Sequence, residues 1–447
     1  MERRGFIHRL FLTSGAVVLG SHCSNADRSK EGSSLTGTAV QQSSGEHIIE
    51  PQREIPVVDR VDVLVVGGGP SGVAAALSAS RAGAATLLIE RYNHLGGLWT
   101  GGLVLPLLST HGLDKNSRQA KAIHGIGDEI HQRLKALDMS ISEVNPVIDP
   151  EAAKYVLEVM LKESGVKVYY HSWASNVIIE DHTLRAVILE TKSGRVAIRP
   201  KVVIDCTGDG DVLHWSGEEY QTMNYEIGLV HRLGNVDRVD RSAPGYEEIH
   251  LGDRTPLPSV NWVNMTGGPY EDALDFKRLS ELQQAHRIEI WEKVQRIRQT
   301  PGHEQVFLLD TAPQQGVRMS RILEGQYRLT FKDSMTYQSF DDSIGVSGAW
   351  ISVLYEGTRI EWDKRPIWQI PFRSLVPKKT NNLLVAGRCF SFEEALFQDA
   401  RIIGTCLVTG HGAGAGAAVA VSSGNSVRDL DIKKIQELLT QQHVRLS

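Results

Sequence analysis

Cysteine is scarce in this chain of 447 residues, which has only four: Cys23, Cys206, Cys389 and Cys406. They lie far apart and form no C-x-x-C pair, so their spacing excludes an iron–sulfur cluster held by cysteines and a zinc ribbon. Cys206 lies in the apolar pattern of a buried strand, which favours buried thiols over a structural disulfide. The sequence predicts no metal site.

The chain also lacks an excess of positive charge and any long hydrophobic run. Its formal net charge is −5, which argues against nucleic acid as a partner because phosphate binding requires a basic surface. No run of roughly 18 apolar residues occurs, so no membrane span is predicted. With 41% hydrophobic residues the chain can bury a large core, and we expect two closely joined domains.

The first residues have the pattern of an export signal. The twin arginine Arg3-Arg4 precedes the short apolar run Leu10–Gly20, and small residues suited to cleavage end at Ala26. We therefore predict a twin-arginine-type signal peptide over residues 1–26 and a periplasmic or otherwise exported protein. A basic N-terminal helix is the alternative. The twin-arginine route carries folded proteins, so it suits a protein that acquires its cofactor before export.

A flexible linker is predicted over residues 27–47, because Ser, Gly, Thr and Gln dominate there without a hydrophobic period. Cys23 raises the alternative of lipid attachment. Gly20 and His22 are poor neighbours for a lipidation cysteine, so export without a lipid anchor is the favoured interpretation.

A glycine-rich turn follows the first buried strand of the folded part. Val61–Val66, apolar except for Asp62, is typical of a parallel strand buried on both faces. Gly67, Gly69 and Gly72 follow in the G-x-G-x-x-G spacing, which allows a tight turn, close approach of a pyrophosphate and close helix packing. Pro70 suits the first turn of a helix whose N-terminus attracts phosphate.

An acidic residue completes this pattern. The next strand, Thr86–Ile89, ends at Glu90, where a carboxylate can accept hydrogen bonds from both ribose hydroxyls. Because strand, glycine turn, helix, strand and acid occur in the right order, the segment predicts a site for an adenine dinucleotide.

Three later segments favour FAD over NAD. Gly96-Gly97 lets the chain fold over the pyrophosphate. Residues 166–199 hold short β-rich stretches joined by polar turns, which predict a β-meander, and the buried strand Lys201–Cys206 runs into Thr207-Gly208-Asp209-Gly210-Asp211. No second strand–glycine turn–helix unit exists, so a nicotinamide domain is not expected.

These motifs together resemble the glutathione-reductase-like flavoproteins. More narrowly, the chain resembles the FAD-dependent oxidoreductases that include the flavoprotein domain of heterodisulfide reductase, over roughly residues 55 to 422. Further matching segments are Asp149-Pro150, Gly234-Asn235-Val236-Asp237, Gly316-Val317-Arg318, Ser320-Arg321, Ile370-Pro371-Phe372-Arg373-Ser374-Leu375 and Leu384-Val385-Ala386-Gly387-Arg388-Cys389. The chain departs from the family in lacking iron–sulfur ligands and in carrying His411 within Gly410–Gly416.

The resemblance implies an α/β fold. A Rossmann-like FAD-binding domain of three layers, with a β-meander, is expected to carry an inserted α+β substrate or cap domain. The predicted divisions are residues 48–219 with 378–425 for the FAD-binding domain, 220–377 for the cap, and 426–447 for a C-terminal helix and tail.

The implied FAD contacts come from every segment described above. The residues expected to bind FAD are Gly67, Gly69, Pro70, Ser71, Gly72, Glu90, Arg91, Gly96, Gly97, Thr100, Val177, Thr207, Gly208, Asp209, Gly387 and Arg388. The Gly- and Ala-rich helix over 404–421 is expected to direct free N–H groups toward the flavin.

Candidate catalytic residues lie mostly in the predicted cap. Arg318, Arg321 and Arg373 would hold a substrate carboxylate if they converge above the flavin; interdomain salt bridges are the alternative. His111 is a candidate general base, as are His231 and His411.

Two further side chains have an alternative chemistry. His94 could carry a covalently attached flavin and Cys389 could be redox-active, but neither role is favoured; Cys389 has no resolving partner in the sequence.

The predicted function is an exported FAD-dependent oxidoreductase. It would transfer a hydride between FAD and a small carboxylate- or sugar-like substrate, with an external electron acceptor or donor. The alternatives are a redox-silent FAD-binding protein that acts as a structural or binding partner, and an FAD-dependent isomerase or lyase.

Overall fold

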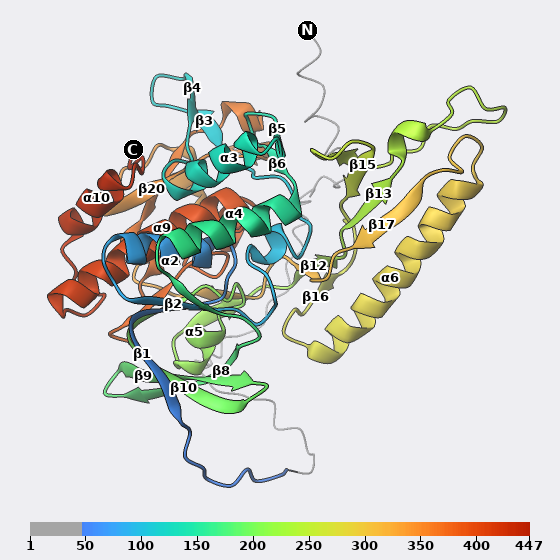
Figure 1. The fold of residues 1–447 in the computed structure, drawn as a ribbon. Coiled ribbons are helices and arrows are strands. Elements are labelled where there is room, and N and C mark those ends of the chain that lie inside the picture. Colours follow the sequence, from blue (N-terminus) through green and yellow to red (C-terminus); the bar gives the residue numbers. More distant parts are fainter. Residues whose placement is uncertain (1–46) are drawn as a thin grey trace, which may run out of the picture. The chain divides into compact units, whose positions relative to one another are not determined.

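The central sheet is built around β1 (Val57–Val66), which contains the strand predicted over residues 61–66. In the computed structural model, which describes residues 47–447, β1 pairs in parallel with β2 (Thr86–Ile89) and with β10 (Gly194–Asp205). The parallel part continues to β7 (Lys167–Tyr169) beside β2 and to β24 (Leu383–Val385) beside β10. Strands β1, β2 and β10 are labelled in Figure 1.

An antiparallel meander branches from the same sheet. It consists of β8 (Trp173–Glu180), β9 (Thr183–Thr191) and the first half of β10. The structure corrects two details of the predicted arrangement. The stretch that starts at Val166 supplies β7 of the parallel sheet, and the return strand predicted over 201–206 is continuous with the last meander strand. These findings confirm the α/β fold class.

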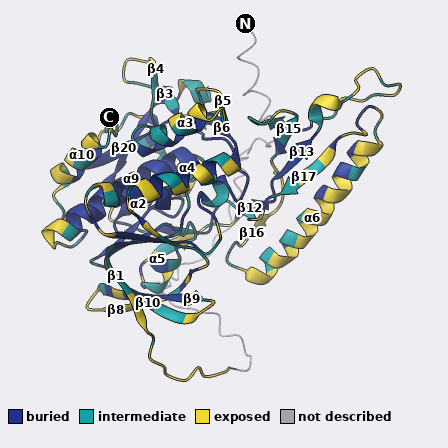
Figure 2. Ribbon diagram, in the orientation of Figure 1, coloured by how far each residue is buried: buried dark blue, intermediate teal, exposed yellow. Residues whose placement is uncertain are grey.

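Alternate side chains of β1 face two different layers. Val63 and Val65 pack with the buried side of α2 (Pro70–Arg81) and α9 (Ile403–Ser423). Leu64 and Val66 pack instead with apolar residues of the meander. Both faces of the strand are buried over its last four residues, Val63–Val66 (Figure 2), which explains why these four residues are all apolar.

Glycines let α9 lie very close to α2. A Cβ at Gly410 would come within 2.0 Å of the Ser71 carbonyl oxygen, and one at Gly414 within 2.3 Å of the Ala75 oxygen. Among the described residues, α9 is the one helix long and apolar enough to cross a membrane, but 94% of its apolar window is buried inside the fold. We therefore interpret α9 as a core helix.

Further helices complete the described chain. These are α3 (Ile126–Ala136), α4 (Pro150–Glu163), α5 (Asp211–Trp215), α6 (Phe276–Gln299), α7 (Phe331–Met335), α8 (Phe397–Ala400) and α10 (Ile432–Gln441). Short 3-10 turns lie at η1 (Gly97–Trp99), η2 (Val236–Arg238), η3 (Trp362–Lys364), η4 (Phe372–Leu375) and η5 (Glu394–Leu396).

The remaining strands form small sheets. They are β3 (His111–Leu113), β4 (Gln119–Lys121), β5 (Ser140–Ile141), β6 (Val147–Ile148), β11 (Tyr220–Thr222), β12 (Tyr225–Gly228), β13 (His231–Gly234), β14 (Asp253–Arg254), β15 (Val260–Val263), β16 (Tyr270–Glu271), β17 (Phe307–Thr311), β18 (Gly316–Val317), β19 (Arg321–Leu323), β20 (Ser343–Ser347), β21 (Val353–Tyr355), β22 (Thr358–Ile360) and β23 (Trp368–Pro371).

Part of the predicted cap has a core of its own. The sheet β14-β15-β13-β17 is covered on one side by α6, and Leu233, Val294, Ile297 and Val306 pack between them (Figure 1). The outer side of α6 is exposed (Figure 2). This part of the chain is an α+β unit.

The last part of the predicted cap is packed differently. Ile344 on β20 and Trp368 on β23 belong to the same hydrophobic cluster as α2 and α9. A Cβ at Gly412 would meet Ile344, so α9 is packed as closely on this side as on the α2 side. Strands β20 and β23 are therefore integrated with the core around the central sheet.

The predicted signal peptide, with Arg3-Arg4 and Cys23, lies outside the described residues, as does most of the predicted linker. Within residues 47–447, Cys206, Cys389 and Cys406 are buried free thiols. No group of His, Cys, Asp or Glu in the described part of the chain is arranged to hold a metal ion.

Candidate active site

The glycine turn has the geometry that its sequence predicts. Gly67 has φ +104°, a left-handed conformation that favours glycine. A Cβ at Gly72 would lie 1.8 Å from the Gly67 carbonyl oxygen, so helix and strand approach closely there. A Cβ at Gly69, in contrast, would meet no atom within 4 Å. The second glycine therefore faces open space, as a turn that receives a pyrophosphate requires.

The first turn of α2 borders this open space. Gly69 is the N-cap residue and no side chain caps the helix, so backbone N–H groups at its start are available to an anion. Pro70 occupies the first helical position, where it has no N–H to satisfy. This arrangement fits the pyrophosphate of FAD.

Glu90 is held beside the turn by backbone hydrogen bonds. Its Oε2 accepts from the Gly68 N–H at 2.7 Å and its Oε1 accepts from the Tyr92 N–H at 2.8 Å. Each carboxylate oxygen has further lone-pair capacity. The buried carboxylate is therefore oriented to accept hydrogen bonds from ribose hydroxyls as well.

Gly96-Gly97 folds back onto the glycine turn. The Gly96 N–H donates to the Gly68 carbonyl oxygen at 2.8 Å, and a Cβ at Gly97 would lie 3.1 Å from the Gly69 Cα. The Thr100 hydroxyl donates to the Leu95 carbonyl oxygen and supports the loop from inside.

Charged and polar side chains contact Asp209 in the predicted FAD-binding segment. It accepts from the Arg388 guanidinium at 2.6 Å and from the Ser320 hydroxyl at 2.8 Å, and Arg91 lies 3.9 Å away. Burial alone would raise the pKa of Asp209, but Arg388 and Arg91 outweigh it and hold that pKa below its usual range. Asp209 is therefore an anion that orders two arginines.

The neighbouring carboxyls have other environments. Asp205 is fully buried, and its carboxylate accepts from the Thr207 N–H and hydroxyl and from the Leu213 N–H, so it shapes the turn. Burial, with the charges of Asp209 and Asp205, raises the pKa of Asp211 to about 6. Asp211 can thus change its protonation state near neutral pH.

The strand before Gly387 also reaches the start of α2. A Cβ at Gly387, which has φ +85°, would lie 2.5 Å from the Ser71 Oγ. The Gly387 N–H donates to the Thr409 hydroxyl of α9 at 3.0 Å. These contacts join the glycine turn, Gly96-Gly97, Asp209 and Gly387-Arg388 into one site.

Val177 differs from the other predicted FAD contacts. Its side chain packs in the apolar layer between meander and sheet. Ser172 and Trp173 are closer to the acid: the Ser172 N–H donates to the Glu90 carbonyl oxygen at 3.0 Å, and the Arg91 guanidinium lies 5.5 Å from the Trp173 ring centre. Sequence reasoning did not identify these two residues.

The three arginines predicted to converge are each engaged with a carboxylate. Arg318 pairs with Glu226 at 2.5 Å, and Arg321 pairs with Asp211 at 3.1 Å and donates to the Asp209 carbonyl oxygen. Arg373 lies 3.6 Å from Asp342, stacks on Tyr327 and Phe340, and is half-exposed. Arg321 is thus joined to the site, whereas no described contact joins Arg373 to it.

The candidate histidines are dispersed. His111 on β3 lies 3.0 Å from the Thr110 hydroxyl, and His231 lies in the cap sheet. Burial lowers the pKa of both, that of His231 to about 4. His94 accepts from the Gln314 amide at 3.0 Å and contacts Asn93 through its other ring nitrogen.

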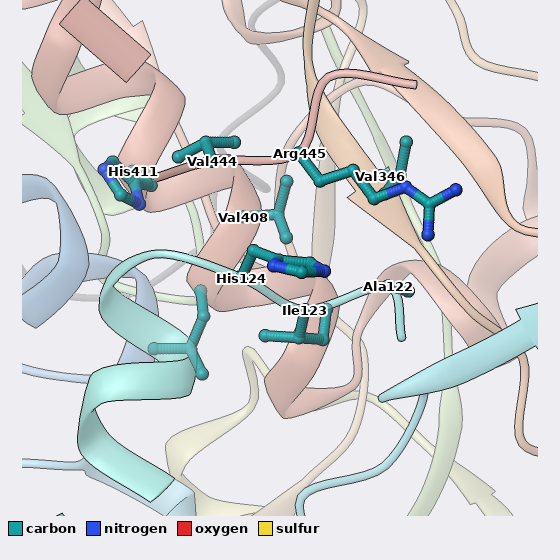
Figure 3. Close-up of a pocket in the computed structure, with 9 residues that line it drawn as sticks. Ala122, Ile123, His124, Val346, Val408, His411, Val444 and Arg445 are labelled. Carbon is teal, nitrogen blue, oxygen red and sulfur yellow. The ribbon is translucent and has the colours of Figure 1, made fainter. Parts of the chain in front are cut away.

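His411 points away from the glycine turn. Its Nε2 lies 2.7 Å from the Gln442 Oε1, and it lines a cavity of about 10 Å³ with His124, Val444 and Arg445 (Figure 3). A cavity of this size holds at most one water molecule. Burial lowers the pKa of His411 to about 4.

One arginine of this region was missed by sequence reasoning. Arg401 lies two residues before the start of α9, and its Nη2 donates to the Gln398 Oε1 at 2.7 Å. Gln398 in turn donates to the Tyr225 hydroxyl of β12 at 3.1 Å. In the sequence, only the position of Arg401 before the Gly- and Ala-rich helix could have indicated a role for it.

The alignments with curated relatives cover only part of each relative's length. A digeranylgeranylglycerophospholipid reductase of Thermoplasma volcanium is 26% identical over 226 residues, which cover 46% of this chain and 54% of the relative. A thiamine thiazole synthase of Aeropyrum pernix is 28% identical over 167 residues, which cover 34% of this chain and 57% of the relative. The chain spans about half the length of these relatives.

Among solved structures, a geranylgeranyl bacteriochlorophyll reductase-like protein from Thermoplasma acidophilum aligns with a TM-score of 0.42 and 16% identity. The alignment covers 87% of this chain and 85% of that protein.

A family model covers most of the chain. The model described as FAD dependent oxidoreductase matches residues 62–228 and 237–439, which include the glycine turn, Glu90, Asp209 and Arg388. The narrower resemblance to the heterodisulfide reductase flavoprotein stays a prediction. The chain belongs to the FAD dependent oxidoreductase family and is an enzyme with FAD as its cofactor.

Proposed function

We propose that this enzyme is exported and transfers a hydride between FAD and a small organic substrate, carboxylate- or sugar-like, with an external electron acceptor or donor. The observation that carries the substrate part is the contact of Ser320 and Arg321 with Asp209. These contacts join residues of the predicted substrate half to the segment expected to bind FAD.

The side chains at this junction have distinct tasks. FAD supplies the hydride-accepting or hydride-donating centre when it is bound. Asp209 holds Arg388 and Arg91 in place, and Arg321 is held by Asp211 and the Asp209 carbonyl oxygen. Fixed guanidinium groups orient a polar substrate and stabilise negative charge that develops on it during hydride transfer. Asp211, with its raised pKa, is placed to exchange a proton near neutral pH.

Anaerobic titration of the purified holoenzyme tests this proposal. Small hydroxy acids, amino acids and sugars are added singly while the flavin absorbance band is followed. We expect at least one class to bleach the band and an added acceptor to restore it. If dithionite bleaches the band but no organic compound does, the redox-silent alternative replaces this proposal.

Product analysis separates the third alternative. The enzyme is incubated with candidate substrates without any electron acceptor. Conversion over many turnovers with an oxidised flavin band indicates an isomerase or lyase, because net oxidation would stop after one turnover without an acceptor.

Export is proposed from the twin arginine alone. In an R3K/R4K double variant, we expect the precursor to remain in the cytoplasm of the producing bacterium, whereas the unaltered protein is recovered from the exported fraction. Equal export of both forms contradicts the twin-arginine route.

A further inference from the structure

Arg401 differs from the other arginines of the junction in its lack of an acidic partner. Arg318, Arg321 and Arg388 are each bound to a carboxylate. Among the described residues, Arg401 instead contacts the neutral Gln398 amide and the Phe397 ring, and its Nε is buried without a hydrogen-bond partner. The charge of Arg401 acts on Asp399, but that carboxylate is already paired with Arg365, so the Arg401 guanidinium has no ion-pair partner of its own in the described part of the chain.

Burial makes this imbalance costly. The loss of hydration lowers the pKa of Arg401 to about 10, and the positive charges of Arg318 and Arg388 act in the same direction. Arg401 is partly buried, and a partly buried cation without a counter-ion is stabilised when an anion binds to it. The planar guanidinium has free donors suited to a carboxylate, which it can bind through two parallel hydrogen bonds.

Aromatic rings lie next to Arg401. The ring centres of Tyr225 and Phe397 are 4.7 Å apart, as are those of Tyr225 and Tyr270. Tyr270 is 59% exposed, so this cluster extends from the solvent to the arginine. Tyr225 and Tyr270 belong to strands β12 and β16 of the predicted cap, whereas Phe397 begins α8 next to α9. The surroundings of Arg401 therefore face the substrate half.

We propose that Arg401, together with Gln398, binds the carboxylate of an organic substrate whose flat or apolar body packs on Tyr225 and Phe397. This inference rests on the proposed function and narrows its substrate class from carboxylate- or sugar-like to carboxylates with an apolar or aromatic body. It also replaces the predicted set of carboxylate-binding arginines, because those three already have acidic partners.

Binding of benzoate and of benzamide, its uncharged isostere, to the holoenzyme tests the proposal. Both probes are titrated while the flavin absorbance and the thermal midpoint are recorded. We expect benzoate to bind the unaltered enzyme and R401Q to weaken that binding by about tenfold or more. R401Q should leave the weak binding of benzamide and the flavin content unchanged. R296Q, at an exposed arginine of α6, is the matched control and should bind benzoate normally.

A conservative variant keeps the test decisive if R401Q folds poorly. R401K retains the charge but loses the planar fork, so we expect benzoate affinity between those of the unaltered enzyme and R401Q. The proposal is overturned if benzoate does not bind the unaltered enzyme, or binds R401Q and R401K unchanged. It is also overturned if R401Q shifts only the flavin reduction potential, since Arg401 would then act on the cofactor. These readouts need no turnover, so they stand even if no compound reduces the flavin.

Discussion

At the scale of single residues, the glycine turn separates two roles that its sequence motif combines. Gly69 faces open space, whereas Gly72 has no room for a Cβ because the Gly67 carbonyl oxygen is 1.8 Å from its position. Gly69 therefore leaves room for the ligand, whereas Gly72 allows the helix to pack closely on the strand.

We predict that G69A and G72A fail in different ways. Gly69 has φ −69°, which alanine adopts freely, so G69A should fold with a nearly unchanged unfolding free energy but release its FAD. G72A should lose about 1–3 kcal/mol of stability through overpacking. Flavin content after gel filtration and urea unfolding of the flavin-free forms measure the two effects. A yellow, fully loaded G69A would contradict the assigned position of the pyrophosphate.

Buried histidines give the stability a pH dependence. The pKa values of His411 and His231 are lowered to about 4, whereas in the unfolded chain histidine binds a proton below about 6.5. The unfolded state therefore binds more protons between these values, and the unfolding free energy falls as the pH falls from 6.5 toward 4. At pH 5 each histidine should account for a loss of about 2 kcal/mol relative to pH 8.

The H411Q variant tests this assignment by urea unfolding at pH 8 and pH 5. Loss of the bond to Gln442 lowers its stability at both values, but the difference between them should shrink by about 2 kcal/mol. An unchanged difference means that His411 is already protonated in the folded protein at pH 5.

Much of the cofactor site could be predicted from the sequence, because local pattern determines it. The spacing of three glycines and the acid after the second strand are properties of one βαβ unit. The special position of Arg401 could not be predicted in this way. An unbalanced charge depends on where every acid lies, and Glu226, which neutralises Arg318, is 92 residues away from it in the sequence.

At the scale of elements, β10 shows where the sequence pattern is ambiguous. Its 12 residues pair first with β9 and then with β1 and β24. Pro200, which the sequence pattern places between two separate strands, lies within this continuous strand. A proline is tolerated in a strand where no ladder partner needs its N–H.

A buried ion pair links Arg365, at the end of η3, to Asp399 of α8, shortly before α9. Arg365 and Asp399 are 0% and 2% exposed and lie 2.6 Å apart, and the Asp399 carbonyl oxygen accepts from the Thr405 hydroxyl of α9 at 2.6 Å. The pair therefore fixes the position of the helix start next to Arg401.

We predict that R365M lowers the unfolding free energy by about 3–5 kcal/mol, because it leaves the Asp399 carboxylate buried without a partner. The double variant R365M/D399L should recover much of this loss, since neither charge is then buried. Urea unfolding measures both variants. As a control, R133A removes a partly exposed arginine of α3 and should cost no more than about 1 kcal/mol. Equal stability of R365M and the unaltered enzyme would contradict this role.

At the scale of the whole molecule, the predicted cap combines two kinds of structure. Leu233, Val294 and Val306 form a small separate core under α6, whereas Ile344 and Trp368 are part of the main core. Hydrophobic periodicity identifies both as buried but does not tell which core they join, because that depends on long-range packing. The division of the chain at residues 219 and 377 therefore stays a prediction.

In the proposed reaction, a substrate at the junction of the cap and the FAD-binding half exchanges a hydride with the flavin. The most direct measurement is anaerobic rapid mixing of the holoenzyme with the first carboxylate found to bleach the flavin band. The same compound is then tested with deuterium at the reacting carbon. We expect the bleaching to be slower for the deuterated compound and strongly impaired in R401Q with full flavin content. Failure of every organic compound to bleach a flavin that dithionite readily reduces would contradict it.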